Sequence, residues 1–131
     1  MNDLDELKKL DLWNDMWNGA LANADDICSP DVTIFFGRDA STHNGDDITG
    51  PAQLKTFVRG FRESLDNDLA FTLVRNLMHP GADFAVSLWN LRVGPDRVVG
   101  GIDVFEFDDA GRIRRVHSVT GQRGITESPS P

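Results

Sequence analysis

The chain of 131 residues carries 21 acidic side chains against 13 lysines and arginines, which gives a formal net charge of −8. This length fits one domain with a single core, and an acidic chain without a basic stripe is not expected to bind nucleic acid or an anionic membrane. No apolar run approaches the roughly 20 residues that span a bilayer, the first residues are acidic where a signal peptide is basic, and the single Cys28 cannot form an internal disulfide, so we expect a cytoplasmic protein.

An amphipathic helix opens the chain. Apolar residues recur every three or four positions over residues 7–21, which is the helical period. Trp13 and Trp17 lie one turn apart and share a face of this helix, where they belong either to the core or to a ligand platform. A short second helix is expected over residues 21–27, because a Ser-Pro-Asp sequence at 29–31 stops it.

A strand and a polar loop follow. Residues 32–36 are β-branched and aromatic, which is typical of a strand. Residues 37–47 contain glycine and polar side chains without a large apolar anchor, so we expect a loop. Within it His43, Asp46 and Asp47 could be read as metal ligands, but they lack a recognised spacing and a second histidine, and we expect solvated charges and no metal site.

The clearest helix of the sequence starts at Pro51, a residue that suits the first helical turn. Five apolar side chains then follow the helical period and form one stripe: Leu54, Phe57, Val58, Phe61 and Leu65. Such a stripe must pack against a sheet or another helix.

Four strands complete the pattern, at residues 69–78, 84–93, 98–107 and 112–120, and short turns separate them. Strands joined by short turns pair antiparallel, so we expect a meander. The last residues, 123–131, have no apolar period and are expected to form a flexible tail.

The third strand of this meander carries an acid on an apolar face. Asp103 shares this face with Phe105 and Phe107, because side chains two positions apart point to the same side of a strand. Burial beside phenylalanine raises the pKa of a carboxyl, which suits it to move a proton near neutral pH. The alternative is a structural acid that only accepts hydrogen bonds. The opposite face carries Ile102 and Val104, and because exposed apolar patches are uncommon on monomers, we expect a homodimer through this face.

Helices first, then one strand, a helix and four meandering strands indicate the α+β class. Five short segments accompany this order: Trp17-Asn18, Ser29-Pro30-Asp31-Val32, Thr49-Gly50-Pro51, Gly101-Ile102-Asp103-Val104-Phe105 and Asp109-Ala110-Gly111-Arg112-Ile113. Together they resemble the nuclear-transport-factor-2-like superfamily, in particular its SnoaL-like and ketosteroid isomerase branches. The resemblance implies one domain over residues 1–122, folded as a cystatin-like, cone-shaped roll. In such a roll a curved, mostly antiparallel sheet wraps around the N-terminal helices and encloses an apolar pocket for a small hydrophobic molecule.

The resemblance also implies a site around Asp103. Ketosteroid isomerases carry a tyrosine on the first helix, an aspartate base on the first strand, and a later aspartate that falls on Asp103. The tyrosine falls near Trp13 and the base near Phe36, so steroid isomerisation is not expected. We expect the pocket to be lined by Trp13, Trp17, Phe36, Phe57, Phe61, Trp89, Phe105 and Ser118.

A second catalytic candidate lies on the last strand, where SnoaL-like polyketide cyclases commonly place a histidine or an aspartate. The comparison with the isomerases turns Val116, Ser118 and Thr120 towards the pocket and His117 away from it. A slip of one residue in the strand register would bring His117 inward, where it could act as an acid or a base.

The resemblance implies an isomerase, cyclase or dehydratase that uses no cofactor and acts on a hydrophobic polyketide- or terpenoid-like metabolite, with Asp103 as the acid or base. Two alternatives stay open. A limonene-type epoxide hydrolase needs two aspartates bridged by an arginine, for which Arg75 or Arg92 could stand beside Asp103. A ligand-binding or accessory dimer needs no catalysis. The sequence has no glycine-rich phosphate loop, nucleophile elbow or cysteine–histidine metal spacing, so it indicates no nucleotide, metal or covalent mechanism.

Overall fold

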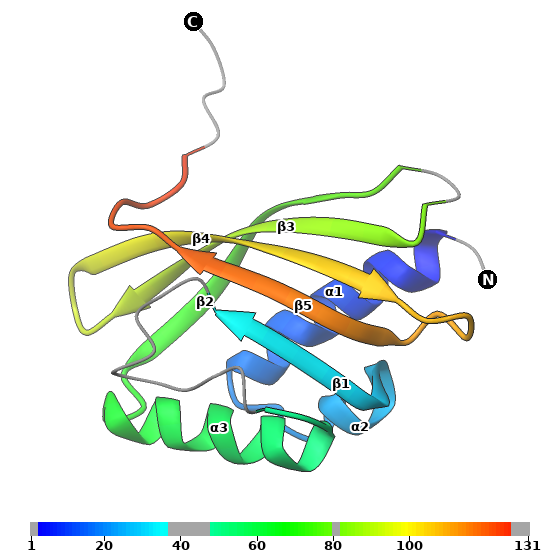
Figure 1. Cartoon of the computed structure of the whole chain (residues 1–131). Helices are drawn as coiled ribbons and strands as arrows, with labels where there is room; N and C mark the ends of the chain where they lie inside the picture. The colour runs from blue at the N-terminus through cyan, green and yellow to red at the C-terminus, as the bar shows by residue number, and fades with distance from the viewer. Residues whose placement is uncertain (1–2, 37–47, 80–81, 127–131) are drawn as a thin grey trace, which may run out of the picture.

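A computed structural model of the chain describes residues 3–36, 48–79 and 82–126 (Figure 1). The described part forms three helices and five strands and confirms the predicted α+β class. The elements are α1 (Asp3–Trp17), α2 (Asn23–Ile27), β1 (Cys28–Phe36), α3 (Pro51–Ser64), β2 (Leu69–Leu77), β3 (Phe84–Val93), β4 (Arg97–Phe107) and β5 (Ile113–Thr120). The loop residues His43, Asp46 and Asp47 lie outside the described residues. No helix within the described ranges is long and apolar enough to cross a membrane.

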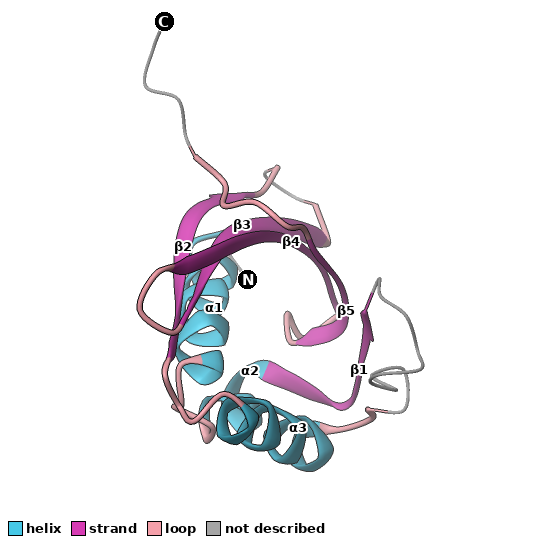
Figure 2. Ribbon diagram, turned by 90° about the vertical axis from the view of Figure 1, so that its left-hand side faces the viewer, coloured by secondary structure: helices cyan, strands magenta, loops and turns pink. Residues whose placement is uncertain are grey.

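The five strands form one mixed sheet in the order β1-β5-β4-β3-β2. Strands β2 to β5 pair antiparallel, as the predicted meander does, and β1 pairs parallel with β5. The sheet is bent into an arch, with α1 against β2 and α3 against β1 on its concave side (Figure 2). This arrangement is the cone-shaped roll that the resemblance implies.

Two β-bulges decide which side chains face the concave side. The β2–β3 register shifts between Leu73 and Arg75, so Leu73 faces inward and Arg75 outward although they are two positions apart. On β5 the shift allows Ile113 and Val116, three positions apart, both to be fully buried. Side chains alternate strictly in a regular strand, so each bulge reverses the faces of the residues that follow it.

The core lies between the three helices and the concave face of the sheet. Helix α1 turns its apolar stripe to the sheet, and α3 does the same with Leu54 and Val58, as the helical period predicts. Removing one large side chain of this kind from water stabilises the fold by roughly 1.5–3 kcal/mol. The largest completely buried side chains are Phe105, Leu10, Met16, Ile27, Ile34, Leu54 and Ile113.

The convex face of the sheet carries apolar side chains that solvent reaches. Ile102 of β4 pairs with Leu88 of β3 on one side and with Val119 of β5 on the other. Ile102 and Val119 are 45% and 52% exposed, which is high for a three-residue apolar row in the middle of a sheet. This is the face through which the sequence predicts a homodimer.

Part of the predicted tail is bound to the convex face. The Asn90 side chain donates a hydrogen bond from Nδ2 to the Ile125 carbonyl at 2.8 Å and accepts one at Oδ1 from the Ile125 amide at 2.7 Å. A Cβ atom on Gly100 would lie 2.6 Å from Ile125 Cγ1, so the segment can approach only because position 100 is glycine. The described part of the tail is therefore attached to the sheet at Ile125.

Candidate functional site

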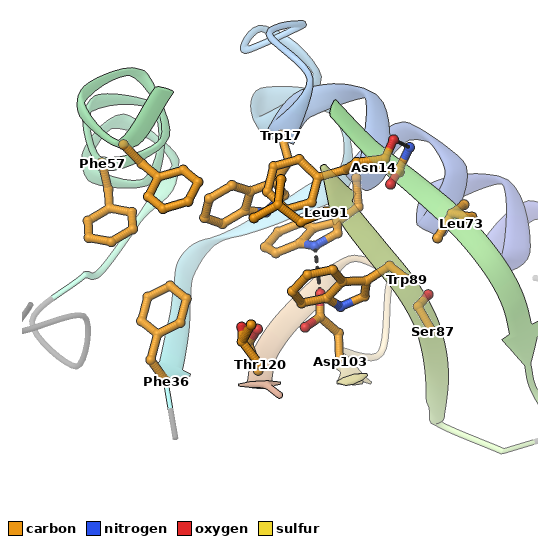
Figure 3. Close-up of a pocket in the computed structure, with 14 residues that line it drawn as sticks. Asn14, Trp17, Phe36, Phe57, Leu73, Ser87, Trp89, Leu91, Asp103 and Thr120 are labelled. Carbon is orange, nitrogen blue, oxygen red and sulfur yellow. Dashed lines mark hydrogen bonds between the residues drawn. The ribbon is translucent and has the colours of Figure 1, made fainter. Parts of the chain in front are cut away.

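Asp103 stands in the middle of the sheet, on its concave face. A row of paired residues crosses all five strands at this level, from β2 to β1, and consists of Asn76, Ser87, Asp103, Ser118 and Phe36. Asp103 belongs to the central part of this row, with a serine on each neighbouring strand. The carboxyl is therefore held by rigid strands rather than by a loop, which fixes its position (Figure 3).

A pocket of about 110 Å³ lies between this wall and the helices. Fourteen residues line it, most of them aromatic or aliphatic: Trp13, Asn14, Trp17, Phe36, Phe57, Phe61, Phe71, Leu73, Ser87, Trp89, Leu91, Asp103, Ser118 and Thr120. Asp103 is the one ionisable side chain among these described lining residues. A mainly apolar pocket with a few polar groups is the usual form of a small-molecule site.

Asp103 is 6% exposed, and its two carboxyl oxygens differ in their surroundings. Oδ2 accepts a hydrogen bond from Trp13 Nε1 at 3.3 Å, whereas Oδ1 is buried and has no hydrogen-bond partner among the described residues. Burial raises the pKa of the carboxyl from its ordinary 3.8 to about 6. The polar groups of Ser118, Trp89 and Trp13 lie close enough to offset part of this rise in pKa, because they favour the charged form, although among the described residues only Trp13 makes a well-formed hydrogen bond to the carboxyl. Asp103 can therefore gain or lose a proton near neutral pH.

Aromatic rings from helices α1 and α3 and from strands β1 and β2 form one wall of the pocket. Trp17 lies at the centre of this wall, with its ring centroid 5.8 Å from that of Phe61 and 5.5 Å from that of Phe71. Phe36 and Phe57 stack with centroids 5.3 Å apart. Aromatic pairs in such arrangements stabilise one another and present flat, rigid faces, so the pocket favours a planar or ring-shaped apolar ligand.

Asn14 of α1 and Asn18, which directly follows the helix, fix the distance between the helix and the sheet edge. The Asn18 side chain donates to the Phe71 carbonyl at 2.9 Å and accepts from the Phe71 amide at 2.7 Å, and Asn14 Nδ2 donates to the same carbonyl at 3.3 Å. These bonds satisfy the backbone of β2, an edge strand of the sheet. They also hold the Trp13 and Trp17 rings over the pocket.

A family model described as the SnoaL-like domain matches residues 10–116, which is most of the chain. The chain belongs to the SnoaL-like family. The match confirms the resemblance to the nuclear-transport-factor-2-like superfamily that the element order and the short segments indicated. No curated protein matches this SnoaL-like sequence.

Solved structures share the fold of this SnoaL-like protein. A protein of unknown function with a cystatin-like fold from Methylobium petroleophilum aligns with a TM-score of 0.76 and 21% identity, over 95% of this chain and 81% of that chain. A candidate isomerase of the SnoaL-like family from Agrobacterium tumefaciens aligns with a TM-score of 0.71 and 17% identity, over 88% and 97% of the two chains. A candidate polyketide cyclase from Acidithiobacillus ferrooxidans aligns with a TM-score of 0.73 and 16% identity, over 89% and 88%. At these identities the likeness shows the fold alone.

The structure brings most of the expected pocket residues of this SnoaL-like protein together around Asp103. The residues that line the pocket as expected are Trp13, Trp17, Phe36, Phe57, Phe61, Trp89 and Ser118. Phe105 is the exception, because it is completely buried behind Trp13, with the two ring centroids 5.5 Å apart in an edge-to-face contact. Phe105 therefore supports the pocket wall without lining it.

His117, the second catalytic candidate, faces away from the pocket, as the comparison with the isomerases implied. The bulge on β5 pairs His117 with Val104, so its ring lies on the convex face, where it is exposed and stacks on Phe35 with centroids 5.0 Å apart. The slip that would turn it inward does not occur, since Ser118 pairs with Asp103 and occupies the inward position. His117 therefore lies on the opposite face of the sheet from the pocket and cannot contact a ligand there.

The arginines considered for an epoxide hydrolase site are also outside the pocket. Strict alternation after Leu73 would place Arg75 inward, but the β2 bulge turns it to the convex side, where it is exposed. Arg92 Nη1 contacts Asp68 Oδ1 at 3.0 Å. The described pocket lining holds neither an arginine nor a second aspartate.

Five lining residues were not among the predicted site residues. Four of them could have been found from strand alternation, because they share a face with Trp89 or follow Leu69 at intervals of two: Phe71, Leu73, Ser87 and Leu91. Asn14 carries no such signal, since it is a polar residue on the flank of an apolar helix stripe. Thr120 was expected to face the pocket and lines it.

Proposed function

We propose that this SnoaL-like protein is a cofactor-independent enzyme that isomerises, cyclises or dehydrates a small hydrophobic metabolite of polyketide or terpenoid type by acid–base chemistry at Asp103. One observation carries the proposal. The Asp103 carboxyl is buried, titrates near neutral pH, and leaves Oδ1 without a hydrogen-bond partner in the described pocket. A buried polar atom that is left unpaired costs stability, and perturbed carboxyls in apolar pockets cluster at functional sites.

The mechanism needs Asp103 in both protonation states. When protonated, the carboxyl donates a hydrogen bond or a proton to a carbonyl or hydroxyl oxygen of the substrate, which makes the neighbouring C–H bonds more acidic or the oxygen a better leaving group. When ionised, it accepts a proton from carbon or oxygen. One group that exchanges a proton near pH 6 can perform both steps in turn, as an isomerisation or a dehydration requires.

The aromatic wall supplies the rest of the catalysis. Trp17 and the rings packed around it exclude water and hold a flexible substrate in a folded shape, which removes part of the entropic cost of ring closure. Trp13 orients the acid by its hydrogen bond to Oδ2. The epoxide hydrolase alternative is favoured by no observation, because the described pocket lacks its second aspartate and its arginine.

A generic proton-transfer assay tests the proposal without knowledge of the natural substrate. We expect the protein to accelerate deuterium exchange at the carbons next to the carbonyl of 2-cyclohexen-1-one in D₂O, followed by proton NMR. Positioned acid–base catalysis contributes about 10²–10⁴-fold, so Asp103→Asn should slow this exchange by about 10²-fold or more. The rate should change with pH around 6, the pKa of Asp103.

Glu106→Gln is the matched control. It makes the same change from carboxylate to amide on the same strand, but Glu106 faces the convex side, where it pairs with Arg114. The exchange rate of this variant should equal that of the wild type. If Asp103→Asn binds the ketone and exchanges its protons as fast as the wild type, the protein is a ligand-binding or accessory protein and the catalytic proposal is wrong.

A further inference from the structure

The Trp89 indole lies where it does because its cross-strand neighbour on β4, Gly101, has no side chain. It pairs across the strands with Gly101, and a Cβ atom added to Gly101 would lie 2.1 Å from Trp89 Cζ2 and 2.5 Å from Cε2. No side chain can therefore stand at position 101 without moving the indole. The ring lies against bare backbone and is braced by Phe71, whose ring centroid is 5.6 Å away.

The indole nitrogen of Trp89 lies close enough to Asp103 to favour its charged form, but it makes no well-formed hydrogen bond within the described residues. Trp89 is 7% exposed, and Nε1 is buried without a partner among the described residues, as is Oδ1 of Asp103. Both side chains line the same pocket, and Figure 3 shows the indole beside the carboxyl. An indole N–H can only donate, and a buried donor is normally paired. A donor and an acceptor that lie side by side without a well-formed bond between them leave a place where one ligand oxygen can pair with both.

Trp13 differs from Trp89 in this respect. Its Nε1 already donates to Asp103 Oδ2 at 3.3 Å, so its N–H is occupied within the protein. Trp13 and Trp89 therefore contribute different things, since one orients the acid and the other leaves a donor facing the pocket.

We infer that Trp89 is a specificity-determining residue whose Nε1–H, together with Asp103 Oδ1, binds the single oxygen of a one-ring ligand such as a cyclic enone or a phenol. A ligand oxygen accepts from the indole and either accepts a hydrogen bond from the protonated carboxyl or donates one to the ionised carboxyl. This inference rests on the proposed function, because it names the substrate class of the same site.

The size of the pocket supports one ring. Its volume of about 110 Å³ is of the same order as the cavity of about 150 Å³ that holds one benzene molecule in an engineered protein. We therefore expect one ring of five or six atoms to fill the space beside Asp103, and a second fused ring to remain largely outside it.

The test compares 2-cyclohexen-1-one with cyclohexene, a ring of the same size without the oxygen, by calorimetric titration at pH 5. One net hydrogen bond corresponds to about a fivefold change in affinity, so Trp89→Phe should lower the preference for the ketone over the hydrocarbon by about fivefold. Affinity for cyclohexene should stay within about twofold, because phenylalanine keeps an aromatic ring there. Phe35→Leu is the control, because it removes an aromatic ring from the convex face, where Phe35 stacks on His117, and its preference should stay within about twofold of the wild type.

Two more arms make the inference refutable. Gly101→Ala should lower the preference in the wild type and have no further effect in the Trp89→Phe background, because it acts by moving the indole. Complete burial of a second fused ring would tighten binding by about 100-fold, whereas we expect the bicyclic octalone to bind within about threefold of cyclohexenone.

The inference is overturned if Trp89→Phe leaves the preference unchanged, if it weakens both ligands equally, or if cyclohexenone does not bind. Its failure is distinguishable from failure of the proposed function. A lowered preference in Trp89→Phe without Asp103-dependent proton exchange would leave the binding role intact and remove the catalysis. Exchange that depends on Asp103, together with an unchanged preference in Trp89→Phe, would support the catalysis and remove the binding role of Trp89.

Discussion

Replacing Asp103 by asparagine should stabilise the protein at neutral pH. Burial raises the pKa of this carboxyl from 3.8 to about 6, which means that the folded state resists ionisation. Between these pH values the folded state binds more protons than the unfolded state, so stability falls as the pH rises through this window. At about 1.4 kcal/mol for each pH unit, the difference between 3.8 and about 6 corresponds to a loss of about 3 kcal/mol above pH 6. Asparagine has no charge to bury, and its side-chain oxygen can still accept the Trp13 hydrogen bond.

Urea unfolding followed by tryptophan fluorescence measures this effect. We expect Asp103→Asn to exceed the wild type in unfolding free energy by up to about 3 kcal/mol at pH 7.5 and by less than about 1 kcal/mol at pH 4, with an unchanged dependence on urea. Other ionisable groups are common to both proteins and cancel in the difference. A difference that does not vary with pH, or a variant that is less stable at pH 7.5, would refute the assignment of a buried, ionisable acid.

Three further predictions concern other parts of the molecule. Trp13→Phe removes the hydrogen bond that favours the charged carboxyl, so the pKa of Asp103 should rise above about 6 in carbon-13 NMR titrations. Asn90→Ala removes both bonds to Ile125, and amide exchange at Ile125 should accelerate by about tenfold or more while the unfolding free energy of the domain changes little. We propose that the protein forms a homodimer through the convex face, and Ile102→Glu, which places a charge in that apolar row, should yield monomers in light scattering. A wild type that is already monomeric at micromolar concentration would contradict the dimer.

The fold was predictable because its signals are local. The apolar period of α1 and α3, and the short turns between the last four strands, each depend on neighbouring residues in the sequence. The position of Asp103 was predictable in the same way, because a strand turns residues 103 and 105 to the same face and Phe105 belongs to the inner face of β4. The parallel pairing of β1 with β5, which begins at Cys28 rather than at Val32, depends on residues far apart in the chain and gave no local signal.

The candidate site was predictable only in part, and the two bulges are the main reason. Which residue of a strand is left unpaired depends on the partner strand, so alternation alone could not place Arg75 on the convex face and left the register of His117 open. The same holds for Asn14 and Asn18, whose bonds to Phe71 join two elements distant in sequence. These asparagines bond to the backbone of residue 71, which is the same for every residue type there. The sequence at position 71 therefore could not indicate the contact.

The close approach of Trp89 to Gly101 has a consequence for how the site can change. The surface behind the indole is main chain, which cannot retract or expand, so the space available to a guest molecule is controlled from one side. A shorter residue at position 89 would give much of the volume of the lost ring to the guest, because the main chain behind it cannot move in and neighbours such as Phe71 relax only partly into the space. A single substitution at position 89 can therefore extend the range of ligands to larger molecules, but not to smaller ones.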